Sequence, residues 1–317
     1  MTIRTFQPGD EAAQVAIYNE AAAELPRFKP ATLVEVQRRT RARDFDPGMR
    51  FFALVDGEPV GYAVFNANGR VSYPWCRKGH EGLAAPLFAR VLSAMQERGM
   101  RHAFAAYRAD WPAVADFFLA NGFVRAREMV NFATDIADLP TAPARRSSAI
   151  TALERRDVPA MLALAPEALR VRTAEELTRH LFQNPYFGPD ALFALRSRSD
   201  DSVVAVGILV VEPTYADPQQ VDSGMPCFRC GAFGTEGMQV KRIRGLFSFL
   251  ARGDQNVYPL GLDLLGHAAL RLGDDDEIGS LAAQVPTDAP HLLKFYERNF
   301  RRQGSFPVFE QQLQGGV

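Results

Sequence analysis

The sequence predicts an α/β (α+β) protein of two tandem domains, each a mixed, mostly antiparallel sheet flanked by helices. With 317 residues the chain is longer than one hydrophobic core usually organises, so two domains of roughly 150 residues are expected. The element order of the first half returns in the second half. Between the halves, residues 139–148 are rich in proline and small polar residues and have no apolar period, which is typical of a linker. We therefore expect one domain at residues 1–138 and another at residues 149–317.

The composition excludes several classes of protein. Apolar residues make up 47% of the chain and charged residues 23%, the balance of an ordinary globular protein. The formal net charge is -1 and the basic residues are scattered, so nothing indicates binding to nucleic acid or to an anionic membrane. Three cysteines argue against a secreted disulfide framework. Since the chain has no signal-peptide core and no run of about 18 apolar residues, we expect a cytoplasmic protein that spans no membrane.

The first half alternates strand and helix signals. A short strand is followed by Asp10, a typical N-cap, and then by a helix. The dipeptide Asp56-Gly57 joins two strands as a hairpin turn. A later strand ends in the polar loop 77–82, which opens a helix that Gly99 closes. The expected strands are residues 3–7, 51–55, 60–65, 70–76, 102–107 and 123–132, and the expected helices follow Asp10 and span residues 31–41, 83–98 and 112–120.

Four features of the first half return in the same order in the second half, as expected of a duplicated domain. Their spacing grows along the chain, so we expect the second domain to carry insertions near residues 215–224 and 253–276. The four matches are Ile3 and Asp10 with Ile150 and Asp157; Phe52-Ala53-Leu54 and Gly61 with Phe193-Ala194-Leu195 and Gly207; Gly82 and the helical Leu87 with Gly245 and Leu250; and Phe117-Phe118 and Gly122-Phe123 with Phe295-Tyr296 and Asn299-Phe300.

The loop before the third helix has the composition of an anion site. A helix N-terminus presents unpaired N–H groups and the positive end of the helix dipole. Gly82 and Ala84 allow a diphosphate to approach that backbone, and Arg77 can add charge-assisted hydrogen bonds. A glycine-rich turn with solvated basic residues is the competing interpretation. The candidate cofactor-binding residues of this loop are Cys76, Arg77, Lys78, Gly79, His80, Gly82, Leu83 and Ala84.

The element order and the loop together resemble the GNAT acetyltransferase superfamily, over essentially the whole chain as two copies. The signature of that superfamily is Gln or Arg, two residues, Gly, one residue, then Gly or Ala. It falls on Gly79-His80-Glu81-Gly82-Leu83-Ala84, with Gly79 where Gln or Arg is usual. The resemblance implies acetyl-CoA, or another acyl-coenzyme A, as the cofactor, with its pantetheine arm beside residues 71–76. It also implies that an amine of a small molecule or peptide attacks the thioester directly.

The resemblance divides the usual functional groups between the two halves. The proton-donating tyrosine of the superfamily falls on Phe118 in the first half, which has no proton to give. In the second half Arg242 and Gly245 match the start of the signature, and bulky Phe247 stands at a small position. Tyr296 falls near the tyrosine position of the second half, where a core or surface tyrosine is an equally good interpretation. Two-domain members of the superfamily often keep one active copy and one structural copy.

The spacing of titratable residues singles out no general base: the candidates are Glu81 and Asp110 in the first half and Asp288 or His291 in the second. Cys227 and Cys230 form a single Cys-x-x-Cys without a second pair of ligands, so we expect no metal site. The chain contains no Gly-x-Ser-x-Gly, Walker loop or dinucleotide fingerprint, which argues against hydrolases, kinases and dehydrogenases.

Three hypotheses follow. The first is an acyl-CoA-dependent N-acetyltransferase whose donor binds at residues 77–84. The second is a catalytically degenerate tandem module that binds CoA or a partner without turnover. The third places the active copy in the second half, with Tyr296 as the proton donor. The sequence indicates neither the acceptor nor the oligomeric state, because acceptor-binding residues follow no general rule.

Overall fold

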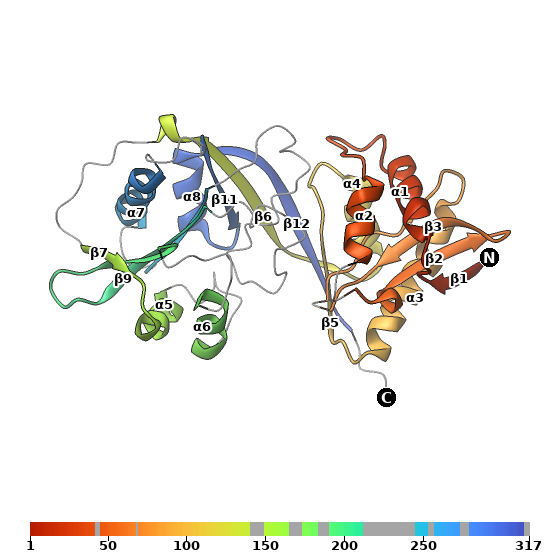
Figure 1. Ribbon diagram of the computed structural model, residues 1–317, viewed down its shortest axis with the longest axis horizontal. Helices are drawn as coiled ribbons and strands as arrows, with labels where there is room; N and C mark the ends of the chain where they lie inside the picture. The colour runs from red at the N-terminus through yellow and green to blue at the C-terminus, as the bar shows by residue number, and fades with distance from the viewer. Residues whose placement is uncertain are drawn as a thin grey trace. The chain divides into compact units, whose positions relative to one another are not determined.

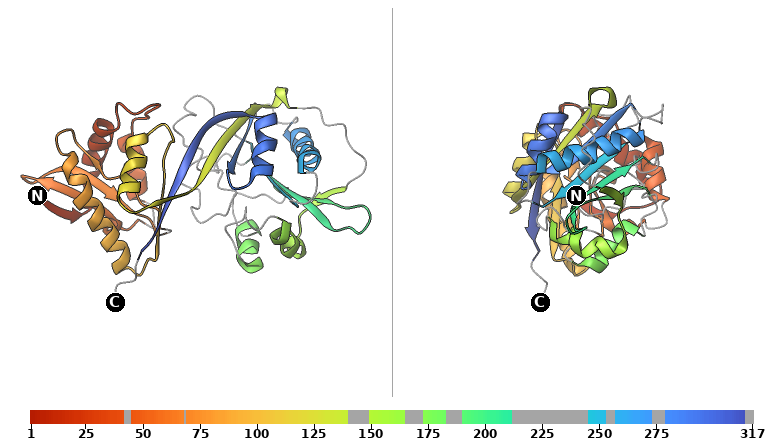
Figure 2. Two further views of the ribbon diagram at one scale, coloured as in Figure 1. Left: turned by 180° about the vertical axis from the view of Figure 1, so that it is seen from behind. Right: turned by 90° about the vertical axis from the view of Figure 1, so that its left-hand side faces the viewer.

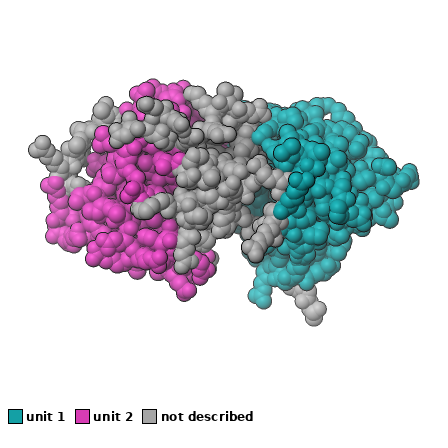
Figure 3. Space-filling model, in the orientation of Figure 1, with its two compact units in different colours: residues 1–127, 306–317 teal, residues 128–305 magenta. Residues whose placement is uncertain are grey.

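The chain forms two compact units, each described here by itself. The computed structural model (Figure 1, with further views in Figure 2) describes residues 1–41, 45–67, 69–139, 149–164, 173–182, 190–211, 245–252, 257–272 and 279–313. Unit 1 contains residues 1–127 and 306–317, and unit 2 contains residues 128–305 (Figure 3). These bounds differ from the expected division at 1–138 and 149–317. Of the expected linker, residues 140–148 lie outside the described part of the chain.

Unit 1 is built from the first part of the chain and its last strand. Its elements are β1 (Thr2–Thr5), α1 (Asp10–Ala21), α2 (Leu33–Thr40), η1 (Pro47–Met49), β2 (Arg50–Val55), β3 (Glu58–Val64), β4 (Trp75–Cys76), η2 (Glu81–Leu83), α3 (Ala84–Glu97), β5 (His102–Ala106), α4 (Pro112–Ala120) and the end of β12 (Arg301–Gln312). β1, β2, β3 and β4 form an antiparallel sheet in that order. The β2–β3 turn is Asp56-Gly57, as predicted, and its φ values of 52° and 86° are those that such a hairpin requires.

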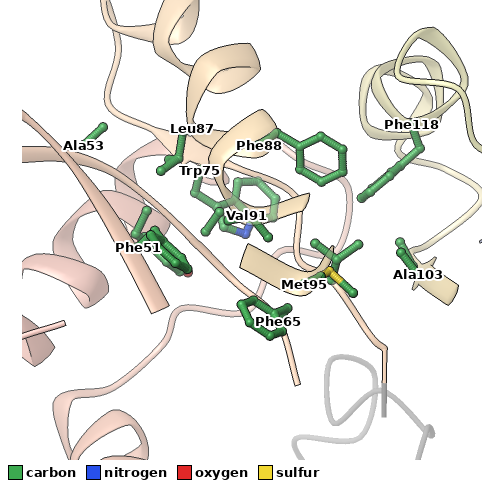
Figure 4. Packing of buried hydrophobic residues seen from close by; sticks show 14 of the residues in the cluster. Phe51, Ala53, Phe65, Trp75, Leu87, Phe88, Val91, Met95, Ala103 and Phe118 are labelled. Carbon is green, nitrogen blue, oxygen red and sulfur yellow. The ribbon is translucent and has the colours of Figure 1, made fainter. Parts of the chain in front are cut away.

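Helices cover both faces of this sheet, with α1 and α2 on one face and α3 on the other (Figure 2). Neighbouring residues of β2 alternate between the faces: Phe52 contacts Phe6 on the α1 side, whereas Phe51 lies on the α3 side with Phe65 (Figure 4). The buried face of α3 carries Leu87, Phe88, Val91 and Met95, which recur at helical spacing. The alternation in β2 and the period of α3 therefore build one core.

The strand that completes unit 1 comes from the end of the chain, and the expectation that residues 123–132 complete the first domain is corrected. β12 pairs antiparallel with β5, with Val308 opposite Ala106. β6 (Val124–Asp135) instead runs into unit 2, where its residues 129–135 pair with β11 (Ser280–Pro286). The core that each strand fills decides its place: Phe309 of β12 is buried in the core of unit 1, whereas Val130 and Phe132 of β6 are buried in a core of unit 2.

Unit 2 holds one mixed sheet in the order β6-β11-β10-β9-β8-β7. Its further elements are β7 (Ala149–Ala152), η4 (Arg155–Asp157), α5 (Val158–Leu164), α6 (Ala174–Phe182), β8 (Leu192–Arg196), β9 (Val203–Val210), β10 (Leu246–Ala251), α7 (Val257–Leu272) and α8 (Pro290–Asn299). β10 and β11 are parallel and the other strand pairs of the described ladders are antiparallel. The predicted layout of a mostly antiparallel sheet flanked by helices is confirmed.

The structure corrects the predicted match of Gly245 and Leu250 to the start of a helix. Leu250 lies in β10, and Gly245 directly precedes that strand. The helix that follows β10 is α7, which occupies much of the stretch expected to be an insertion at 253–276. A short apolar run such as residues 246–251 fits a buried strand as well as a helix, and its period alone does not separate the two. The other expected insertion, at 215–224, lies outside the described residues.

The turn before the first helix is held in the same way in both units, at the matched residues Asp10 and Asp157. Each aspartate accepts a hydrogen bond from the backbone N–H of the residue three positions earlier. Each also forms an ion pair with an arginine on a strand of its own unit, Arg4 of β1 or Arg196 of β8. The contacts are Gln7 N–H to Asp10 (2.7 Å), Arg4 to Asp10 (2.6 Å), Glu154 N–H to Asp157 (2.9 Å) and Arg196 to Asp157 (2.8 Å). Asp10 is the first residue of α1, and the N-cap is Gly9.

Among the helices of the described residues, none is long and apolar enough to cross a membrane.

Candidate functional site

The segment that leads into β4 meets β5 of unit 1 at one point, Arg70 beside Phe104, and the two then separate. The Val71 N–H donates to the Phe104 carbonyl at 2.8 Å, and the Phe104 N–H donates to the Gly69 carbonyl at 2.9 Å. Further along, β4 pairs with β3 and β5 pairs with β12, in two different sheets. The facing edges of β4 and β5 therefore diverge. A diverging edge of this kind can pair with an extended ligand as with an added strand.

Directly after the divergence, a loop presents backbone N–H groups at the start of α3. The loop leaves β4 at Arg77, whose N–H donates to the Val60 carbonyl at 2.8 Å, and passes through η2 into α3. Gly79 has a φ of 82°, a left-handed value that favours glycine. A Cβ added at Gly79 or Gly82 would meet no heavy atom within 4 Å. The structure thus brings residues 76–84 together at an open helix start, as the sequence predicts; their role as cofactor ligands stays a prediction.

Carboxylates of the chain contact two N–H groups of this loop. The Lys78 N–H donates to Glu20 Oε1 of α1 at 3.0 Å, and the Gly79 N–H donates to Glu81 Oε1 at 3.0 Å. The Lys78 side chain pairs with Glu24 at 2.6 Å. The N–H groups of Lys78 and Gly79 therefore already bind negatively charged oxygens, which here belong to the protein's own side chains.

The two acidic candidates for the general base in unit 1, Glu81 and Asp110, are both held in their ionised form. The backbone N–H groups of Glu81 and Gly79 lower the pKa of the Glu81 carboxyl below its usual value. Arg108 donates to Asp110 from Nε at 2.8 Å and from Nη2 at 2.9 Å, and these hydrogen bonds lower the pKa of Asp110. A carboxylate with a lowered pKa is a poorer proton acceptor at neutral pH.

Aromatic side chains gather where β4 and β5 diverge. The Tyr73 N–H donates to the Tyr107 hydroxyl at 2.6 Å, so this hydroxyl lies against the segment that leads into β4. The ring of Tyr107 stacks on that of Phe118, with centroids 5.7 Å apart and planes at 24°. Trp75 contacts both Tyr73 and Tyr107 through ring edges. A phenolic hydroxyl thus lies beside the phenylalanine that replaces the tyrosine of the resemblance.

Cys76, the last residue of β4, carries a packed thiol. Burial, followed by the charge of Glu81, raises the pKa of this thiol to about 11. Gly61 lies opposite Cys76 in β3, and a Cβ added at Gly61 would meet the Cys76 Sγ at 2.9 Å. The thiol is therefore protonated at neutral pH, and its close packing requires a glycine partner.

In unit 2, the strands β10 and β11 diverge in a similar way. These strands pair at one position, Leu246 with Ala282. A cavity of about 10 Å³ lies beside them, and Ser248, Gln284 and Tyr296 contribute polar groups to its lining. The Tyr296 hydroxyl donates to the carbonyl of Phe247 in β10 at 3.4 Å. A volume of this size suits a single water molecule.

The remaining candidates lie apart from these features. Asp288 and His291 are exposed near the start of α8. Gly245 lies at the end of β10 that is opposite to the end leading into α7. Arg242, Cys227 and Cys230 lie outside the described residues. Within the described part of the chain, no group of three or more His, Cys, Asp or Glu side chains could hold a metal ion.

Glu20 and Tyr107 were not among the residues predicted from the sequence. Glu20 lies far from the loop in the sequence, and tertiary packing of α1 brings it to Lys78, so no local pattern could reveal it. Tyr107 carried a usable signal, because it is the one tyrosine between residues 102 and 132. It follows β5, and its neighbour Phe118 stands where a hydroxyl was expected.

No protein-family model and no curated protein sequence matches the chain. Among solved structures, the chain is similar to a GCN5-related N-acetyltransferase from Sphaerobacter thermophilus, with 15% identity and a TM-score of 0.62 over 100% of this chain and 96% of that one. It is similar to a fungal GCN5-related glucosamine N-acetyltransferase region of a multi-domain β-N-acetylglucosaminidase, with 14% identity and a TM-score of 0.63 over 98% of this chain and 38% of that one. A tandem GNAT protein of the clavulanic acid biosynthesis pathway matches with 13% identity and a TM-score of 0.54 over 100% and 99% of the two chains. The chain therefore has the tandem GNAT fold.

Proposed function

We propose that this chain of tandem GNAT fold is an N-acyltransferase, which moves an acyl group from acyl-CoA, with acetyl-CoA as the first donor to test, to an amine of a small molecule or peptide. The observation that carries the proposal is the order of parts in unit 1. There, β4 and β5 diverge immediately before a loop in which two backbone N–H groups donate to carboxylates of the chain. An extended thiol arm and a diphosphate are the two features of coenzyme A that such parts would bind.

The donor diphosphate would bind at residues 77–84. Small residues at Gly79 and Gly82 leave room beside the backbone, because an added Cβ at either position meets open space. Arg77 and Lys78 flank the same loop and can donate to phosphate oxygens. The structure has a strand only at Trp75–Cys76 of the stretch expected to be a strand at residues 70–76, and we propose that the pantetheine arm follows residues 71–76 into the divergence.

The transfer itself needs an amine to attack the thioester carbonyl, so that a C–N bond forms and the C–S bond breaks. The departing thiolate takes a proton, and we assign that proton to the Tyr107 hydroxyl, which lies at the divergence. Glu81 and Asp110 have lowered pKa values and take no part in the proposed chemistry as bases. The amine would lose its proton to solvent.

Isothermal calorimetry with acetyl-CoA tests donor binding. Gly82→Glu adds bulk and negative charge at the loop and should abolish binding, while Gly279→Glu serves as the matched control. Both glycines have open space around an added Cβ and neither has a left-handed φ, so the fold should tolerate both changes. Absence of binding to the unmodified protein at millimolar ligand would overturn the proposal. Equal binding by Gly82→Glu would remove the site from this loop.

Turnover is tested with a panel of amines, following free thiol released from acetyl-CoA. Glucosamine belongs in the panel, since one of the similar structures is described as a glucosamine N-acetyltransferase region. Amino acids and peptide N-termini represent the other acceptor classes. Donor binding without turnover above the chemical background for any amine would favour a binding module without catalysis.

A further inference from the structure

We infer that Glu20 and Glu81 compete with the donor diphosphate for the loop N–H groups and thereby set the affinity of unit 1 for coenzyme A. This inference rests on the proposed function, because it concerns the same loop. It assigns a role in ligand selection to two acidic residues, one of which lies on α1, outside the loop.

The geometry places a carboxylate oxygen on each of two consecutive N–H groups. Glu20 Oε1 accepts from the Lys78 N–H, and Glu81 Oε1 accepts from the Gly79 N–H, both at 3.0 Å. A carboxylate and a phosphate present the same kind of negatively charged acceptor oxygen to an N–H group. A diphosphate that binds these N–H groups must therefore displace one carboxylate or both.

The ion pairs around the loop also indicate that acidic side chains oppose a bound diphosphate. Arg77 lies 3.7 Å from Glu20 Oε2, and the ammonium of Lys78 lies 2.6 Å from Glu24 Oε1. The two basic side chains are thus already paired with acids of the N-terminal segment. A doubly charged diphosphate meets three carboxylates, those of Glu20, Glu24 and Glu81, at the loop that would hold it.

Exposure determines how large this competition is. Glu81 is exposed, and the Glu20 side chain is 37% exposed. Solvent screens exposed charges, so each carboxylate opposes the diphosphate less than a buried one would. Replacing one of them with glutamine keeps the shape and removes the charge. We expect each such variant to bind coenzyme A about three- to tenfold more tightly.

The test compares ligands with and without the diphosphate. Calorimetry would measure the Kd of coenzyme A and of pantetheine for the full-length protein and for Glu81→Gln and Glu20→Gln. Glu97→Gln is the matched control, because Glu97 is an exposed acid on α3 that pairs with Arg90, away from the loop. Both loop variants should lower the Kd of coenzyme A, with the Kd of pantetheine unchanged and the Glu97→Gln values equal to those of the parent.

The outcomes separate the two proposals. If coenzyme A binds the parent and both loop variants equally, or the variants more weakly, the competition is refuted and the proposed function stands. If pantetheine gains affinity as much as coenzyme A does, the carboxylates act on the thiol arm or on the fold, and the competition is refuted as well. If coenzyme A binds none of these proteins, the proposed function fails and the inference fails with it.

Discussion

Phe118 of α4 stacks on Phe309 of β12, with ring centroids 5.8 Å apart and planes at 16°. Both side chains are fully buried in the core of unit 1. Phe309 belongs to the last strand of the chain, which enters unit 1 after the whole of unit 2 has been traversed. The core around the proposed donor site therefore includes a residue from the opposite end of the sequence.

Phe309→Ala should destabilise unit 1 by about 3–5 kcal/mol, because it removes a buried ring and leaves a cavity beside Phe118. Denaturant unfolding followed by fluorescence of Trp75 and Trp111, both in unit 1, measures the loss. Gln312→Ala, at an exposed position of the same strand, is the control and should change stability little. A similarly small effect for Phe309→Ala would contradict the assigned pairing of β12 with β5.

Tyr107→Phe should lower kcat about a hundredfold while leaving the donor KM unchanged, because it removes the proposed proton donor and keeps the ring stacked on Phe118. The same measurement on Tyr296→Phe should give the parent kcat. Steady-state kinetics with the best amine of the panel reads out both variants. The reverse pattern, with Tyr296→Phe inactive and Tyr107→Phe active, would place the chemistry in unit 2.

Asp10→Asn should reduce stability at pH 7 by about 1–3 kcal/mol, because the hydrogen bonds from Arg4 and Gln7 then reach a neutral group. Burial alone would raise the pKa of Asp10, but the hydrogen bonds from Arg4 and from the Gln7 N–H outweigh it and the pKa is lowered. A lowered folded-state pKa gives stability that is present above the unfolded pKa of about 3.9 and is lost as pH falls through the folded value.

The pH dependence of the free energy of unfolding tests this sign. The gap between the parent and Asp10→Asn should be constant from pH 7 to about 5 and should shrink below about pH 4. Asp116→Asn, exposed on α4, is the control and should run parallel to the parent over that range. A gap that widens as the pH falls would mean that the Asp10 carboxylate does not stabilise the folded state.

Cys76 should resist alkylation at pH 7 to 8, since its buried thiol has a pKa of about 11 and the thiolate is the reactive form. Mass spectrometry of the peptide that contains Cys76, after treatment with iodoacetamide, measures the modified fraction in native and in urea-unfolded protein. Native protein should be modified far more slowly than unfolded protein. Equal rates in the two states would show that the residue is not packed against Gly61 as the structure has it.

Local signals made much of unit 1 predictable. Asp56-Gly57 forms the predicted hairpin turn because two consecutive left-handed residues suit Asp and Gly, and this preference depends on no distant contact. The order of strand, polar loop and helix around Gly82 was likewise readable, because helix starts carry their own composition. The location of the candidate donor loop followed from these signals.

In unit 2 local signals were weaker, and one was misread. Residues 246–251 form a strand, although the spacing of Gly245 and Leu250 matches that of Gly82 and Leu87 and so predicted a loop followed by a helix. A short apolar run buries equally well in either form, so the choice depends on the neighbouring strand and on the core. The match of Asp10 with Asp157 was more informative, because both aspartates make the same local contact with a backbone N–H three residues earlier.

By itself, the sequence determined the tandem layout, most of the element order of unit 1 and the position of the loop that could bind a diphosphate, since turns, helix starts and repeated patterns are local features of a chain. The tertiary structure decided which strand completes which unit, and it brought Glu20 to the N–H of Lys78 and the Tyr107 hydroxyl to the N–H of Tyr73. These contacts join residues that are distant in sequence. They form because burying apolar side chains such as Phe309 of β12 outweighs the cost of closing long loops, and no local pattern encodes that balance.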